Sequence, residues 1–141
     1  MRICTVNDIE LMIESIQTSD NSISQYAARK IAIQFLSRPE YIIISPCDKC
    51  ILILKKFSDI SLEVHLSYFK PIQHFRKYIL QTIKEIFQET QYSKIIIFIP
   101  EDLKSLIKVL KKLLFEYEGL LKKAIKMSGT ARDLHIYSLN K

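Results

Sequence analysis

The sequence predicts an α/β (α+β) fold in which about four helices flank a mostly antiparallel mixed sheet. Short runs rich in β-branched isoleucine have the length of buried strands. Between them lie longer segments whose apolar residues recur at helical spacing. No internal repeat, linker or low-complexity tract divides the chain, so we expect a single domain over residues 1–141.

The N-terminal half is expected to hold a short strand, two helices and three strands. The first strand spans Met1–Val6, and Asn7 or Asp8 is the expected N-cap of the first helix. The second helix ends near Arg38, because Pro39 disfavours helical backbone before it. Three strands follow, at Tyr41–Ser45, Ile51–Phe57 and Ile60–Phe69.

The C-terminal half alternates helices and strands before a final hairpin. A long amphipathic helix is expected over about Gln73–Thr90, and a buried strand at Ile95–Ile99. A further helix begins after Pro100 and extends to about Phe115. The last two strands lie around Leu120–Lys126 and Leu134–Ser138, joined by a turn at Ser128-Gly129.

The composition limits the class of protein. Of 141 residues, 48% are hydrophobic, which suffices for a folded core. No apolar run approaches the ~18–20 residues of a membrane helix. The 3 cysteines form no dense pattern and no leader segment is evident, which excludes a disulfide scaffold and indicates a reducing compartment. We therefore expect a cytoplasmic protein without a membrane segment.

The last third of the chain carries a series of motifs at fixed spacing. In order they are Leu113-Leu114-Phe115, Glu118-Gly119, Lys122-Lys123, Asp133 and Ile136-Tyr137-Ser138. Together with the order of elements, this series resembles the GNAT acyltransferase superfamily, including its phage-encoded members. The resemblance implies the acetyltransferase fold and acetyl-CoA as the acyl donor.

Several positions depart from the pattern of that superfamily. Its members hold the pyrophosphate of acetyl-CoA on a glycine-rich loop at a helix N-terminus, whereas the corresponding Lys70–Arg76 contains no glycine. Leu103 replaces an asparagine and Leu114 a glycine. Leu110 replaces a tyrosine that acts as general acid toward the leaving thiolate, and a leucine cannot donate a proton. These departures predict a degenerate member that binds no acetyl-CoA and acts by binding a protein partner.

Two functions from different classes stay open. A degenerate member would bind another macromolecule. If the protein is viral, that partner would be a host factor or a virion component, and the protein would lie in the host cytoplasm or in the virion. An active member would be an N-acetyltransferase that moves acetyl from acetyl-CoA to an amine.

If the protein is an enzyme, Glu63 and His65 are the candidate catalytic residues. They lie two positions apart on a predicted strand and hence on the same face. The resemblance implies that this strand supplies the base for the substrate amine, a role that suits an imidazole with a pKa near ~6.5. The alternative is a polar sheet face on which Glu63 pairs with a lysine. Polar and cationic side chains would hold the phosphates of acetyl-CoA, namely Gln73, His74, Arg76 and Lys77.

Basic residues gather late in a chain whose formal charge is +6. They are Lys104, Lys108, Lys111 and Lys112 on one predicted helix, followed by Lys122, Lys123 and Lys126. Such a surface attracts acidic proteins, CoA phosphates or nucleic acid, or it is simply a solvated face. Nucleic acid is the less favoured partner, because no aromatic residues interleave with these lysines. A leucine stripe on the same helix, Leu103, Leu106 and Leu110, predicts either core packing or a homodimer interface.

The pair Cys47 and Cys50 has the spacing of half a zinc site, with no second pair of ligands apparent. A turn with two small side chains is the simpler interpretation, and we expect no metal.

Overall fold

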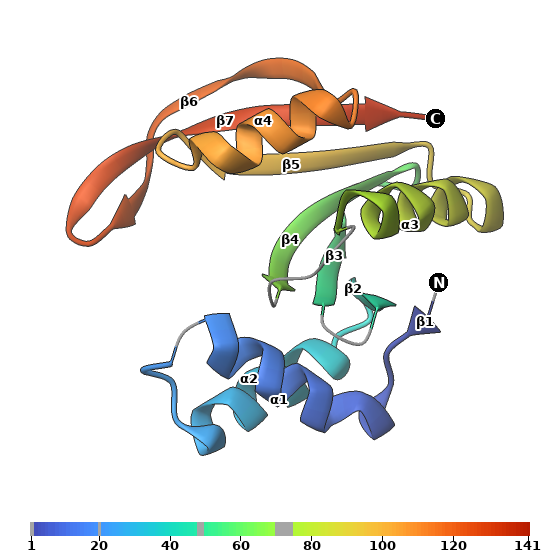
Figure 1. Cartoon of the computed structure of the whole chain (residues 1–141), viewed down its shortest axis with the longest axis vertical. Coiled ribbons are helices and arrows are strands. Elements are labelled where there is room, and N and C mark those ends of the chain that lie inside the picture. The colour runs from blue at the N-terminus through green and yellow to red at the C-terminus, as the bar shows by residue number, and fades with distance from the viewer. Residues whose placement is uncertain (1, 20, 48–49, 70–74) are drawn as a thin grey trace.

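Strands and helices follow one another as the hydrophobic periodicity predicts (Figure 1). The computed structural model describes residues 2–19, 21–47, 50–69 and 75–141. The helices are α1 (Ile9–Ser19), α2 (Gln25–Leu36), α3 (Phe75–Glu89) and α4 (Lys104–Lys112), with a short 3-10 helix, η1, at Val6–Asp8. The strands are β1 (Arg2–Ile3), β2 (Tyr41–Cys47), β3 (Cys50–Lys56), β4 (Ser61–Phe69), β5 (Lys94–Pro100), β6 (Glu116–Met127) and β7 (Thr130–Asn140).

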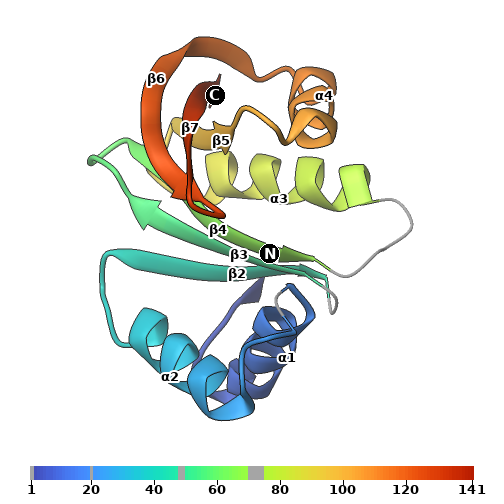
Figure 2. The ribbon, with the colours of Figure 1, turned by 90° about the vertical axis from the view of Figure 1, so that its left-hand side faces the viewer.

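The strands form one sheet in the order β1-β2-β3-β4-β5-β7-β6. Neighbouring strands are antiparallel except β4 and β5, which run parallel and are connected through α3. Helices α1 and α2 lie on one side of the sheet, and α3 and α4 lie on the other (Figure 2). The predicted class, a mostly antiparallel mixed sheet flanked by helices, is therefore confirmed.

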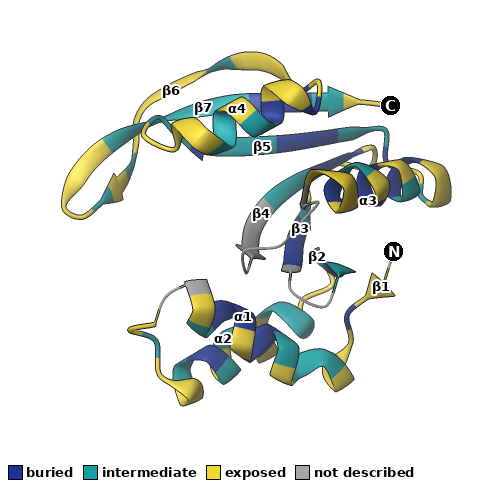
Figure 3. Ribbon diagram, in the orientation of Figure 1, coloured by how far each residue is buried: buried dark blue, intermediate teal, exposed yellow. Residues whose placement is uncertain are grey.

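Helices α1 and α2 bury a small, closely packed core against β2 and β3. Their buried positions recur every three or four residues, as expected for helices with one apolar face. Figure 3 shows these buried stretches alternating with exposed ones along both helices. The core residues are Met12, Ile13 and Ile16 of α1, Ala28 and Ala32 of α2, and Ile43, Ile51 and Ile53 of the strands.

Helices α3 and α4 cover the opposite face with a second and larger core. The buried apolar residues that α3 contributes are Ile79, Ile83, Ile86 and Phe87, and they share this core with strand residues such as Leu54, Leu62 and Ile95. Truncating one of these side chains to alanine removes buried area and leaves a cavity, at a cost of about 2–5 kcal/mol. The two cores therefore hold the sheet rigid from both sides.

The N-terminus differs from its prediction at the helix cap. The side chain of Thr5 accepts a hydrogen bond from the Asn7 N–H at 3.3 Å, and the Asp8 carboxylate accepts one from the Thr5 N–H at 2.9 Å. This reciprocal arrangement is a capping box in which Thr5 is the N-cap of η1, so the helical backbone that leads into α1 begins before the expected cap at Asn7 or Asp8. Since Val6 enters η1, the strand is also shorter than predicted.

Helix α4 ends three residues earlier than predicted, in a Schellman motif. The Phe115 N–H donates to the Leu110 carbonyl at 3.0 Å, and the Leu114 N–H donates to the Lys111 carbonyl at 3.1 Å. The motif requires left-handed backbone at Leu114, whose φ is +66°. This position carries a glycine in the superfamily that the sequence resembles, and a leucine here is strained.

Candidate functional site

The two parallel strands separate partway along their length. β4 and β5 pair at only four positions, from Ser61 opposite Lys94 to Val64 opposite Ile97. Beyond these residues β4 continues to Phe69 and β5 continues to Pro100, but the two strands no longer pair with each other. Their ribbons diverge (Figure 1). The sheet is therefore open beyond Val64 and Ile97.

Glu63 lies at this opening. It pairs in register with Ile96, one position before the last pair, and is half-buried. Val64 packs against the core under α3 and α4, so strand alternation turns Glu63 to the side of α1 and α2. A carboxylate thus stands at the edge of the opening, on one face of the sheet.

The prediction that His65 shares this face rests on strict alternation, which the strand does not keep. In the pairing with β3, Val64 lies opposite Leu54 and Leu66 lies opposite Ile53, so His65 is the extra residue of a β-bulge. A bulge leaves its extra residue out of the ladder and re-aims the side chains that follow. The His65 side chain lies outside the described part of the structure, and its predicted role stays a prediction.

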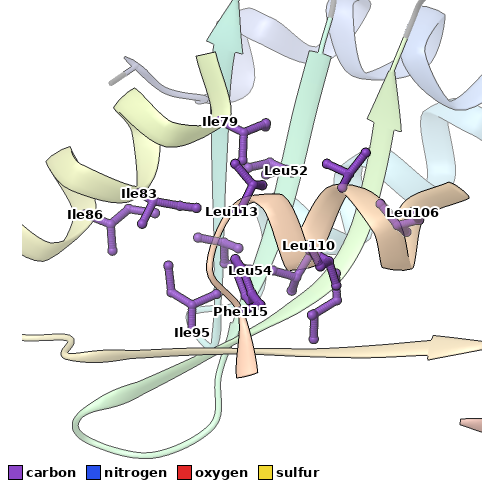
Figure 4. Close-up of a pocket in the computed structure, with 13 residues that line it drawn as sticks. Leu52, Leu54, Ile79, Ile83, Ile86, Ile95, Leu106, Leu110, Leu113 and Phe115 are labelled. Carbon is purple, nitrogen blue, oxygen red and sulfur yellow. The ribbon is translucent and has the colours of Figure 1, made fainter. Parts of the chain in front are cut away.

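An apolar cavity lies on the other face, between the sheet and the helices α3 and α4 (Figure 4). Its free volume is about 70 Å³. The lining residues that the structure describes are all apolar, namely Leu52, Leu54, Val64, Ile79, Ile83, Ile86, Ile95, Ile97, Leu106, Val109, Leu110, Leu113 and Phe115. Val64 and Ile97 belong to this lining, so the cavity adjoins the point where the strands separate.

Leu110 occupies the position at which the resemblance implies a proton-donating tyrosine. Its side chain is 5% exposed and lines the cavity. The leucine stripe on α4 thereby faces the core, because Leu106 also lines the cavity and Leu103 alone of the three is exposed. Leu110 therefore packs in the core, as the first interpretation of this stripe predicts, and the homodimer stays a prediction.

The residues expected to hold CoA phosphates are only partly described. Gln73 and His74 lie outside the described residues. Arg76 and Lys77 are both exposed in the first turn of α3, which carries no acidic residue. Helix N-termini attract anions through their free N–H groups and the helix dipole, and two cations there add to that attraction. This turn therefore suits a phosphate, and the role of Arg76 and Lys77 in holding acetyl-CoA stays a prediction.

A polar cluster across β5, β7 and β6 was not predicted from the sequence. The Glu118 carboxylate accepts a hydrogen bond from the hydroxyl of Ser138, which is fully buried, and pairs with Lys94 Nζ at 3.2 Å. The Ser138 hydrogen bond, and secondly Lys94, hold the pKa of Glu118 below its usual range. Lys94 is the first residue of β5 that pairs with β4, at the end of the pairing that is away from the opening of the sheet. The cluster therefore has a structural role. The motif residue Glu118 thus acts as scaffold.

The remaining candidates form no site in the described part of the chain. No group of three or more histidine, cysteine, aspartate or glutamate residues there could hold a metal ion. The late lysines are all exposed on α4 and β6. None of the described helices has the length and apolar character to cross a membrane.

Known proteins with the same arrangement of elements are found by structure and not by sequence. No protein-family model matches the chain, and no curated protein sequence matches it. A GNAT-family acetyltransferase from Bacillus anthracis superposes with a TM-score of 0.74 at 18% identity, over 99% of this chain and 92% of that one. A spermidine N-acetyltransferase variant from Vibrio cholerae gives 0.77 at 12% identity, over 99% and 93%. The ribosomal-protein-S5-alanine acetyltransferase from Vibrio fischeri gives 0.75 at 14% identity, over 99% and 91%.

These similarities establish that the chain has the fold of GNAT-family acetyltransferases, as the resemblance implied. At such identities they establish the fold alone, and the function must be argued from the site.

Proposed function

We propose that the protein is an N-acyltransferase that takes an acyl group from an acyl-CoA thioester and transfers it to an amine. The observation that carries the proposal is the opening between β4 and β5 after Val64 and Ile97. One face of this opening bears the Glu63 carboxylate, and the other leads to an apolar cavity. A polar acceptor and an apolar acyl group can therefore approach the same point from opposite faces of the sheet.

Glu63 would take the proton that the amine loses on acylation. A half-buried carboxylate at the edge of the opening has the position that a general base needs. The bound thioester would supply an activated acyl group. Arg76 and Lys77, at the start of α3, would attract its phosphates.

The replacement of tyrosine by Leu110 alters the predicted pH dependence without abolishing transfer. A thiol has a pKa near ~8.5, so its thiolate is a fair leaving group without a proton donor. We therefore expect activity that does not fall as the pH rises from 7 to 9, unlike that of an enzyme that depends on a protonated tyrosine.

Calorimetry and a thiol-release assay test the proposal. Acetyl-CoA should bind at moderate salt, and Arg76→Ala should weaken that binding. With a panel of polyamines and peptide amines as acceptors, Glu63→Gln should lower the rate about 10²–10⁴-fold at unchanged acetyl-CoA affinity. Glu116→Gln, which changes an exposed carboxylate at the start of β6, is the matched control. The absence of binding by CoA and by every acyl-CoA, at millimolar concentration, would overturn the proposal.

A second candidate is a degenerate member that binds a protein partner, and the apolar environment of Leu110 favours it. Its partner would be acidic, because the lysines of α4 and β6 are exposed. The resemblance to phage-encoded proteins adds host and virion components to the partners worth testing. In this case acetyl-CoA gives no heat, whereas an acidic polypeptide binds and duplex DNA does not. Sedimentation at several protein concentrations tests for a homodimer.

A further inference from the structure

The cavity under α3 and α4 has an accessible side and a closed side. Nine of its lining residues are buried, with exposures of 9% or less. The four half-buried ones are Val64, Ile97, Leu106 and Val109. The first two end the paired stretch of β4 and β5, and the other two lie on α4. The more exposed lining residues thus lie at the opening of the sheet and on α4, and we take this side as the mouth of the cavity.

The chemistry of the lining selects what can enter. Each lining side chain is apolar, so a water molecule inside would find no hydrogen-bond partner among them. Leu110 contributes to this property, because a tyrosine at its position would bring a hydroxyl that needs a partner. Leucine at this position, which cannot donate a proton, thus keeps the described part of the cavity wall apolar.

The volume sets the size of the occupant. A water-sized group needs roughly 10–15 Å³ of such space. A free volume of about 70 Å³ therefore takes on the order of five of these groups. The methyl group of acetyl would leave most of this space empty.

From the mouth, the lining and the volume, we infer that the cavity binds the acyl chain of the thioester. The preferred chain then has about four to six carbons and is longer than acetyl. This inference rests on the proposed function, since the thioester must sit at the opening of the sheet for its acyl chain to reach the mouth.

Calorimetric titration with CoA, acetyl-CoA, butanoyl-CoA and hexanoyl-CoA tests the inference. Each buried pair of methylene groups should tighten binding about tenfold, so butanoyl-CoA should bind about tenfold more tightly than acetyl-CoA. Hexanoyl-CoA should bind at least as tightly as butanoyl-CoA.

Variants at the mouth connect the preference with the cavity. Val109→Phe adds volume at the mouth and should abolish the advantage of butanoyl-CoA while leaving the affinity for CoA unchanged. Leu106→Phe is a second variant at the same mouth. It is used if thermal melting shows that Val109→Phe does not fold. Ile33→Phe, at a position of α2 that is 50% exposed, is the control and should retain the preference.

The outcomes separate this inference from the proposed function. If acetyl-CoA and butanoyl-CoA bind equally well, or if both mouth variants fold and keep the preference, the inference is wrong and the proposed function stands. If neither CoA nor any acyl-CoA binds, the proposed function fails, and the inference falls with it.

Discussion

The backbone N–H of Lys123 donates a hydrogen bond of 2.8 Å to Oδ1 of Asp133, across the hairpin of β6 and β7. Lys123 lies in an irregular stretch of β6, between the pairs that Leu121 and Ile125 form with β7, and its φ is +48°. The carboxylate thus satisfies an N–H group that the ladder leaves out. This contact gives Asp133 a structural role in the hairpin of β6 and β7.

Removing this acceptor should destabilise the hairpin. A hydrogen bond to a charged group contributes about 1.5–3 kcal/mol when buried and less at an exposed position such as this one. We expect Asp133→Ala to lower the free energy of unfolding by about 1 kcal/mol. Urea denaturation measures the change, and Asp102→Ala, at an exposed turn, is the control. Equal stability of Asp133→Ala and the original chain would contradict the role given to the carboxylate.

Glycine at position 114 should stabilise the protein. A left-handed backbone costs a residue other than glycine about 1–2 kcal/mol, and the entropy that glycine loses on folding offsets part of the gain. We expect Leu114→Gly to raise the free energy of unfolding by about 0.5–1 kcal/mol. Leu121→Gly, at another exposed leucine that lies within a strand, should instead be destabilising. A melting temperature lowered by Leu114→Gly would mean that the leucine side chain has contacts that outweigh the strain.

The thiol of Cys4 should react slowly in the folded protein. Burial, and secondly the Asp8 carboxylate, raise the pKa of Cys4 from 9.0 to about 11. At pH 8 its thiolate fraction is then about a hundredfold smaller than in the unfolded chain. Alkylation followed by mass spectrometry, with and without urea, measures the ratio at this cysteine. Rates that differ less than about tenfold would show that the thiol is accessible.

The same pKa makes stability depend on alkaline pH. Because the folded state holds the proton more tightly, the contribution of Cys4 is complete below pH 9 and is lost as the pH rises toward 11. Cys4→Ala should flatten this part of the stability profile relative to the original chain. Every other titratable side chain is present in both proteins, so the comparison isolates the contribution of Cys4. Parallel profiles would contradict the assignment.

Glu118 should contribute to stability in the acid range. Hydrogen bonding from Ser138, and then Lys94, lower the pKa of Glu118 from 4.5, so the folded state favours the carboxylate. The contribution is present above pH 4.5 and is lost as the pH falls below that value. Unfolding of Glu118→Gln between pH 2 and 7 should show a shallower acid loss than the original chain. Ser138→Ala should produce part of the same effect, and an unchanged acid slope in both variants would refute it.

Hydrophobic periodicity sufficed for the order of elements because each helix and strand buries one face. The ends of elements depend on hydrogen bonds between few atoms, and these were harder to predict. The spacing of Thr5 and Asp8 is a capping-box signal that could have located the first cap. The strain at Leu114 depends on the residue at which α4 ends. Hydrophobic periodicity locates a helix end only to within a few residues.

The candidate site was predictable only in part. The strand that carries Glu63 could be recognised from its alternation, but the bulge at His65 arises from the register with β3, which no local pattern encodes. The cavity is assembled from β3, β4, β5, α3 and α4, whose residues are distant in sequence. Its volume depends on how their side chains pack, and packing is a property of the folded chain.

The short parallel pairing of β4 with β5 also divides the chain into two contiguous parts. Strands β1–β4 come from residues 2–69 and strands β5–β7 from residues 94–140, with a single crossover through α3. Each part has an antiparallel ladder of its own, and four residue pairs join the two ladders. A break in the turn before β5 should therefore give two fragments that reassemble by complementation, with the apolar core under α3 and α4 as their joint interface.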